Sequence, residues 1–172
     1  MSRTRSSSTG KIGAGGVIRD QLGNWITGFQ VNLGTGEILD AEAWGLLYGL
    51  KLVLNLHISH LEVESDSAIL VQLMQKAEFS LHPLGSLLKG CSNIMDAMEN
   101  AHLSHIFREC NMTADCLAKD SINHELGTII FEYPPPPFMM RRHILMTSLL
   151  FLEQGGAPAL ILSLFVVFVW VF

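Results

Sequence analysis

One acidic residue, Asp66, lies where a short strand is predicted to meet a helix. In residues 61–67 acidic side chains alternate with Leu, Val and Ser, and an apolar-rich run follows at 68–74. Alternation with period two predicts a strand, and the run that follows predicts a helix. Asp66 is therefore expected at the carboxyl edge of a sheet, where open α/β proteins bind ligands. The alternative is that Asp66 only caps the helix, as aspartate often does.

Two further acids occupy similar predicted positions. Glu42 lies in the first turn of a helix predicted over 40–56, and Asp115 lies in the first turn of a helix predicted from 111 to 119, after a strand at 103–107. An acid in the first turn of a helix is often only a surface residue that the helix dipole favours. If the three carboxylates converge at one edge of a sheet, they form a site for Mg²⁺, which prefers carboxylates, water and phosphates.

The elements that must position these acids follow an α/β pattern. Two β-prone runs, 13–20 and 25–31, flank a polar segment with Gly and Asn, which predicts a hairpin. Helices and strands then alternate, with a helix to about residue 75 and another over 84–99. This order predicts an α/β domain with a mixed sheet.

The helix over 40–56 is predicted to be amphipathic. Asp40 is the expected N-cap. The side chains expected to face the core follow helical spacing: Trp44, Leu47, Leu50 and Leu54.

Composition limits the function classes. The 172 residues suit one domain with a real core, and the net charge of −5 provides no overall basic field for nucleic acid. Contacts to phosphates would have to come from local Lys and Arg. Three cysteines without metal-ligand spacing indicate core thiols in a reducing, intracellular compartment, which means the nucleus or the cytoplasm.

The two ends of the chain differ from its middle. Residues 1–10 are rich in Ser, Thr and Arg and are expected to be a disordered lead. The proline run 134–137 is expected to end the domain, so that 11–137 is the domain and 138–172 a hydrophobic tail of doubtful origin. The sixteen uncharged residues of 157–172 are fewer than the ~20 that span a bilayer. The tail is either a marginal membrane anchor or an aberrant extension.

Four motifs in order resemble a known family. They are Gly13–Asp20 (GAGGVIRD), Ala41–Leu46 (AEAWGL), Val63–Ser67 (VESDS) and His105–Ala118 (HIFRECNMTADCLA). Each is weak alone, but together they span the predicted domain. The chain resembles plant ribonuclease H-like domains of the reverse-transcriptase type.

The resemblance implies a ribonuclease H-like fold, with a mixed five-stranded sheet flanked by helices. It implies Mg²⁺-dependent hydrolysis of the RNA strand of an RNA–DNA hybrid, which is recognised through 2′-hydroxyls and phosphates. Glu42, Asp66 and Asp115 match three of the four acids that hold two Mg²⁺ ions in the family. Two such ions, about 4 Å apart, activate a water and stabilise the leaving oxygen.

One family feature has no counterpart. The family's first acid lies in an Asp-Gly motif on a central first strand, but no Asp or Glu precedes Asp20 and residues 1–10 contain no β-prone run. The first strand is therefore expected to be missing, which would leave its neighbours with unpaired edges. Cleavage is expected to be far slower than in a four-acid relative. The alternatives are a non-catalytic nucleic-acid-binding module and a tail-anchored membrane remnant.

A histidine near the last acid has two interpretations. Many ribonucleases H use a mobile histidine there in product release or proton transfer, and His105 is the candidate. Because His105 lies in a predicted strand, a structural role is the other interpretation.

Overall fold

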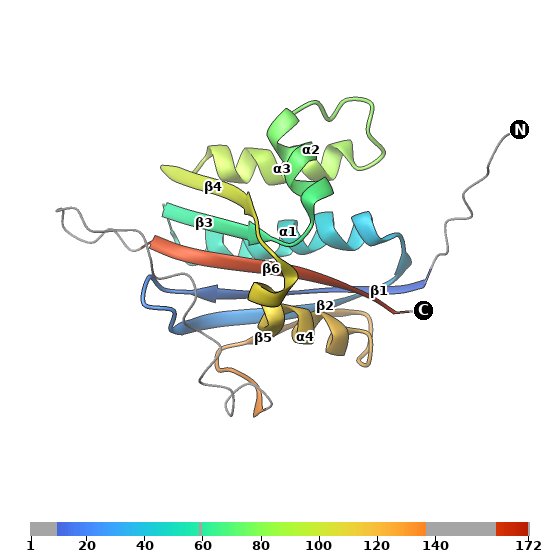
Figure 1. Cartoon of the computed structure of the whole chain (residues 1–172), viewed down its shortest axis with the longest axis vertical. Helices are drawn as coiled ribbons and strands as arrows, with labels where there is room; N and C mark the ends of the chain where they lie inside the picture. Colours follow the sequence, from blue (N-terminus) through green and yellow to red (C-terminus); the bar gives the residue numbers. More distant parts are fainter. Residues whose placement is uncertain (1–9, 59, 137–160, 172) are drawn as a thin grey trace, which may run out of the picture.

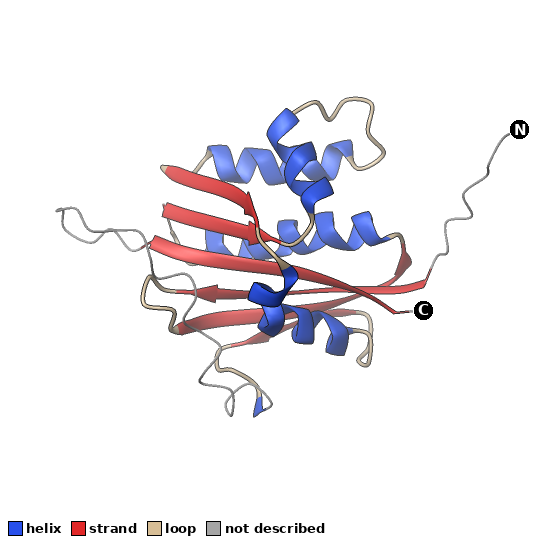
Figure 2. Cartoon of the chain, viewed as in Figure 1, coloured by secondary structure: helices blue, strands red, loops and turns tan. Residues whose placement is uncertain are grey.

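The computed structural model describes residues 10–58, 60–136 and 161–171. Figure 1 shows one mixed sheet with helices on both faces, and Figure 2 shows the same view by secondary structure. In chain order the elements are β1 (Gly10–Arg19), β2 (Trp25–Gly36), α1 (Ile38–Asn55), β3 (His60–Ser65), α2 (Ala68–Lys76), α3 (Gly85–Asp96), β4 (Asn100–His105), a 3₁₀ turn (Arg108–Asn111), α4 (Met112–Ser121), β5 (Gly127–Phe131) and β6 (Ile161–Val171). The predicted α/β order is confirmed, and the structure adds β5 and β6.

The predicted hairpin is formed by β1 and β2, which pair antiparallel. Its turn is closed by Asp20, whose carboxylate accepts hydrogen bonds from the backbone of Leu22 and Asn24. Residues 12–18 of β1 are all buried, because helices cover both faces of the sheet here. Beyond β2, the short strand β5 pairs antiparallel and forms one edge of the sheet.

The strand order is β4-β3-β6-β1-β2-β5. β6 runs antiparallel to β1 and parallel to β3, and in Figure 1 it lies between them. In the part of the chain that the structure describes, the sheet has no gap at this position and contains six strands, where five were predicted. The sequence prediction left 138–172 outside the domain, whereas the structure includes Ile161–Val171 in the sheet.

The other predictions for the two ends of the chain concern mostly residues that the structure does not describe. Of the predicted lead, 1–10, only Gly10 is described, and it begins β1. Among the residues that the structure describes, none belongs to a helix long and apolar enough to cross a membrane.

The helix α1 packs on one face of the sheet, but its N-cap residue and its buried side differ from the prediction. Its N-cap is Glu37, and Asp40 completes a capping box by accepting from the Glu37 backbone N–H at 3.0 Å. Leu50 is buried as expected, but Trp44 and Leu54 are 40% and 48% exposed. The difference arises because small residues let a different side of the helix lie close to the sheet. The small buried residues of α1 are Ala41, Ala43, Gly45 and Gly49.

Two hydrophobic clusters lie on the two faces of the sheet. The larger joins β1–β4 to α1, α2 and α3. The smaller lies under α4 and contains Val17, Ala114 and Leu117. In this smaller cluster the backbones of β1 and α4 lie very close together. A Cβ built on Gly15 would lie only 2.5 Å from the Ala118 backbone nitrogen. The fold thus presents α1 and α4, each with a predicted site acid in its first turns, on opposite faces of the same strands.

Candidate active site

A serine links Glu42 to the end of β3. Ser67 is the N-cap of α2, and its hydroxyl accepts a hydrogen bond from the Leu70 backbone N–H at 3.2 Å. The same hydroxyl donates a hydrogen bond to the Glu42 carboxylate. The interpretation of Asp66 as the helix cap is therefore wrong, because Ser67 performs that function and leaves Asp66 available for other contacts.

Burial dominates the electrostatics of Glu42. Its side chain is half-buried beneath the start of α2. Burial raises the pKa of the Glu42 carboxyl to about 7. The hydrogen bond from Ser67 lowers this pKa, and the negative charge of Asp66 raises it. Among the described residues, the groups that shift this pKa include no cation, so Glu42 is a half-buried acid whose only polar contact of this kind is with Ser67.

Asp66 is the electrostatic centre of the candidate site. It follows the last residue of β3 and is half-buried. Burial raises its pKa, and the nearby Arg108 lowers it; Asp115 raises it and His105 lowers it further. Asp66 thus interacts electrostatically with Asp115 of α4 and His105 of β4, and it acts in turn on Glu42 of α1.

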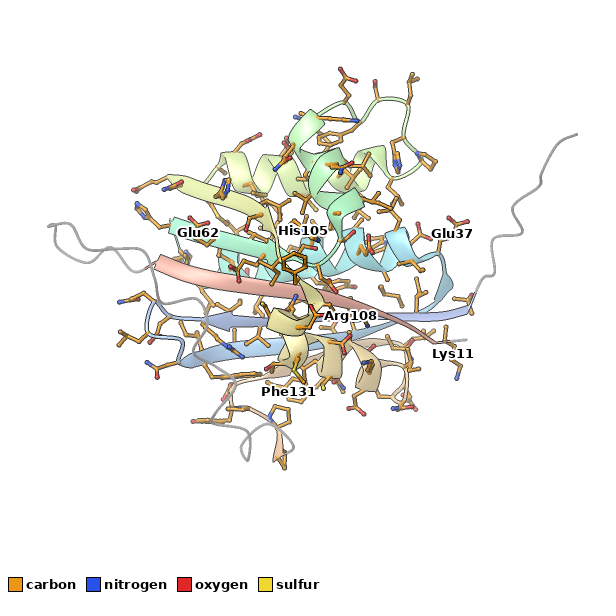
Figure 3. The ribbon with its side chains drawn as sticks, in the orientation of Figure 1. Lys11, Glu37, Glu62, His105, Arg108 and Phe131 are labelled. Carbon is orange, nitrogen blue, oxygen red and sulfur yellow. The ribbon has the colours of Figure 1, made fainter. Side chains whose placement is uncertain are left out.

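The third acid, Asp115, is held by two cations. It is only 8% exposed. Its Oδ1 accepts from Arg108, with 3.1 Å to Nε and 2.5 Å to Nη2, and its Oδ2 lies 2.5 Å from the Lys119 Nζ. Figure 3 shows Arg108 on the segment that leads into α4, in front of the sheet. Both carboxylate oxygens of Asp115 are therefore engaged by the protein itself.

The donor set fits one divalent cation better than two. Within the described parts of the chain, no three His, Cys, Asp or Glu side chains are arranged to hold a single metal ion. Asp115 is paired with its two cations, whereas Glu42 and Asp66 are half-buried acids whose pKa values are raised mainly by burial, with Arg108 opposing the rise at Asp66. One Mg²⁺ is commonly held by one or two carboxylates plus water and phosphate. Glu42 and Asp66, which are electrostatically coupled, are two carboxylates of the kind that this requirement names.

Sequence reasoning did not reveal the contacts of three side chains, Ser67, Arg108 and Lys119. Lys119 has i+4 spacing to Asp115, which is typical of an ion pair on a helix. Arg108 is one of the local basic residues expected to contact phosphates, but its pairing with Asp115 had no local signal. A further cation, Arg19, donates to the Thr113 hydroxyl at 3.2 Å, so three basic residues gather around α4.

His105 lies at the end of β4 and is exposed. Its ring packs edge-on against Phe107, with 6.1 Å between ring centroids. It is therefore not a core residue, and it acts on Asp66 electrostatically. Its role in product release or proton transfer stays a prediction.

Comparison with known proteins gives a consistent assignment. A family profile described as "Reverse transcriptase-like" matches residues 3–121. A protein of Arabidopsis thaliana named "Putative ribonuclease H protein" is 33% identical over 126 residues, which are 73% of this chain. The chain spans only 20% of the length of that relative.

A solved structure supports the fold. The ribonuclease H1 of the archaeon Halobacterium salinarum superimposes with a TM-score of 0.63 at 19% identity, covering 70% of this chain and 91% of the other. At that identity the likeness concerns the fold alone. Together with the profile match over more than half of the chain, it gives the assignment: the chain belongs to the reverse transcriptase-like family and has the ribonuclease H-like α/β fold.

Proposed function

We propose that this chain is a ribonuclease H-like domain that binds an RNA–DNA hybrid and, with Mg²⁺, cleaves its RNA strand far more slowly than a four-acid relative. The observation that carries the proposal is the electrostatic coupling of Asp66 to both Glu42 and Asp115, with Asp115 held in ion pairs. The acids supply oxygen ligands for a cation, and the ion pairs of Asp115 lower the number of oxygens that are available to it. Family membership supplies the class of substrate.

Glu42 and Asp66 are the proposed Mg²⁺ ligands. An ion there stabilises negative charge on phosphate oxygens, which is the chemistry that phosphodiester hydrolysis requires. Binding of a cation would also relieve the repulsion between the two buried carboxylates. The hydrogen bond from Ser67 orients the Glu42 carboxylate, on which the charge of Asp66 also acts. Asp115 is the third proposed catalytic acid, and it becomes available only when Arg108 or Lys119 moves to another anion.

The cations around α4 are the proposed phosphate contacts. Arg108 and Lys119 are 56% and 54% exposed at their side chains while they contact Asp115, and Arg19 lies nearby on Thr113. A hybrid backbone phosphate at α4 would compete with Asp115 for Arg108 and Lys119. Binding would then depend strongly on salt, because each phosphate contact releases counterions.

The membrane alternative has less support than the nucleic-acid alternatives. It requires residues 157–172 to enter a bilayer, yet Ile161–Val171 is paired on both sides within the sheet. The non-catalytic binding module has more support, because the ion pairs of Asp115 would favour binding without turnover. We place the protein inside the cell, in the nucleus or cytoplasm, where its hybrid substrate would occur.

The test uses a labelled RNA–DNA hybrid with Mg²⁺ and the full chain. We expect slow cleavage of the RNA strand that Asp66→Asn abolishes and Glu78→Gln, an exposed control far from the site acids in sequence, leaves unchanged. Binding is measured at several salt concentrations. Salt-sensitive binding with no cleavage above the Asp66→Asn background would assign the non-catalytic module. No binding at low salt would refute both nucleic-acid functions.

A further inference from the structure

The segment that follows β4 begins as a continuation of the sheet. The backbone N–H of Ile106 donates to the carbonyl oxygen of Ser65 at 2.9 Å, one step beyond the last paired residues of β3 and β4. Phe107 follows in extended backbone, with φ −72° and ψ 144°, and its carbonyl oxygen accepts from the Cys110 N–H at 2.9 Å. These hydrogen bonds hold Phe107 on both sides, next to the end of β3 that leads into Asp66.

The side chain of Phe107 is far more exposed than its fixed backbone requires. It is 74% exposed, whereas Phe29 and Phe79 are 1% and 7% exposed. Its contact with the His105 ring is edge-to-face, with 6.1 Å between centroids and 72° between the ring planes. This contact limits the positions that the Phe107 ring can take. With three-quarters of the side chain exposed, at least one face of the ring is open to solvent.

A cation lies next to this ring in the chain. The Arg108 side chain is 56% exposed while it contacts Asp115, and its charge also acts on Asp66. Consecutive Cα atoms are about 3.8 Å apart, so the ring and the guanidinium are presented from the same short segment. An open aromatic ring stacks on a nucleobase, and an arginine binds a phosphate. Phe107 and Arg108 together therefore match the two ends of a nucleotide, whereas an apolar partner would gain nothing from Arg108.

A base inside a duplex cannot supply the contact that the open ring offers. In a continuous duplex each base is stacked between its neighbours, so both of its faces are covered. A base in a single strand has a free face and stacks readily on aromatic side chains. The ligand that fits Phe107 is therefore an unpaired nucleotide and not a base pair of the hybrid.

We propose that Phe107 stacks on an unpaired nucleobase next to the bound hybrid, with Arg108 on an adjoining phosphate, so that the domain prefers hybrids that continue into a single strand. Phe107 is then a specificity-determining residue, and His105 supports its ring. This inference rests on the proposed binding of RNA–DNA hybrids, but it requires no cleavage. It names the class of nucleic acid that the site selects: a junction between a hybrid and a single strand.

The first experiment compares two labelled hybrids of the same sequence, one blunt and one extended by a short single strand. Fluorescence anisotropy at low salt without divalent cations gives the two affinities. The parent should bind the extended hybrid about five- to tenfold more tightly. Phe107→Ala and Phe107→Leu should lower this ratio by about fivefold, and Phe107→Tyr should keep it because the ring remains. Leu81→Ala, which removes a 98% exposed side chain between α2 and α3, is the control and should behave as the parent.

The Leu variant separates stacking from charge. It keeps Arg108 and an apolar side chain at position 107, so any extra affinity from the phosphates of the extension remains, and only the ring is lost. The second readout is 2-aminopurine placed at the first unpaired position, whose fluorescence falls when it stacks. We expect quenching with the parent and with Phe107→Tyr, and none with Phe107→Leu. Thermal melts of all variants should match the parent, because a side chain so exposed adds little to the stability of the fold.

The outcomes separate this inference from the proposed function. An equal affinity ratio for the parent and Phe107→Leu, or 2-aminopurine fluorescence that does not change on binding, would overturn the inference and leave hybrid binding intact. A large drop in the melting temperature of Phe107→Ala would give the ring a structural role and would also contradict the inference. No binding of either hybrid by the parent at low salt, with or without Mg²⁺, would refute both this inference and the proposed function.

Discussion

Replacing Glu42 by Gln should make the protein more stable at high pH and leave it unchanged at low pH. The pKa of Glu42 rises from its ordinary 4.5 to about 7 because the carboxyl is buried. Folding therefore favours the protonated form, and the folded state holds the proton more tightly than the unfolded state. The contribution of Glu42 to stability is therefore largest below pH 4.5, falls as pH rises from 4.5 to 7, and stays low above 7.

The size of the effect follows from the same values. At about 1.4 kcal/mol for each pH unit, the rise from 4.5 to about 7 corresponds to a loss of at most about 3 kcal/mol, and partial exposure of the side chain reduces it. Gln cannot ionise, but its side-chain oxygen can still accept the hydrogen bond from Ser67. We therefore expect Glu42→Gln to exceed the parent in unfolding free energy by about 1–3 kcal/mol at pH 8.

Urea denaturation followed by circular dichroism at pH 4, 6 and 8 measures this difference. Divalent cations must be absent, because an ion beside Glu42 would stabilise its charged form. The control is Glu78→Gln on the exposed loop after α2, for which the difference from the parent should not change with pH. If the advantage of Glu42→Gln is the same at pH 4 and pH 8, or reverses in sign, the reasoning from burial is wrong.

Three other substitutions test the contacts of the site and the packing beneath it. Ser67→Ala should cost about 1–2 kcal/mol in unfolding free energy, measured in urea, because it removes the α2 cap and a hydrogen bond to a buried acid. Gly15→Ala should destabilise by about 1–3 kcal/mol because its methyl group would collide with α4, whereas Gly90→Ala in α3 has room and should be neutral or stabilising; thermal melts that rank them in reverse would contradict this packing. Arg108→Ala should weaken hybrid binding at low salt and reduce the salt dependence, measured by fluorescence anisotropy, and an unchanged salt slope would exclude Arg108 as a phosphate contact.

Local pattern was sufficient for most of the elements. The alternation at residues 61–65 and the apolar runs on either side of the hairpin turn depend on short-range periodicity, so β1, β2, β3 and the helices were predictable within a few residues. Even so, the buried side of α1 was misjudged at Trp44, because Ala and Gly carry little hydrophobic signal although they allow the closest packing. β5 was missed because a run of only five residues gives a weak pattern.

The sequence by itself determined which acids stand at the ends of strands and starts of helices, because local spacing decides that. The tertiary structure alone decided their partners. Arg108 meets Asp115 across a turn, and Ser67 meets Glu42 across 25 residues, so no local pattern could reveal either contact. Nor could local pattern reveal that β6 enters the centre of the sheet, because strand order depends on which unpaired edges remain when the rest of the chain has folded.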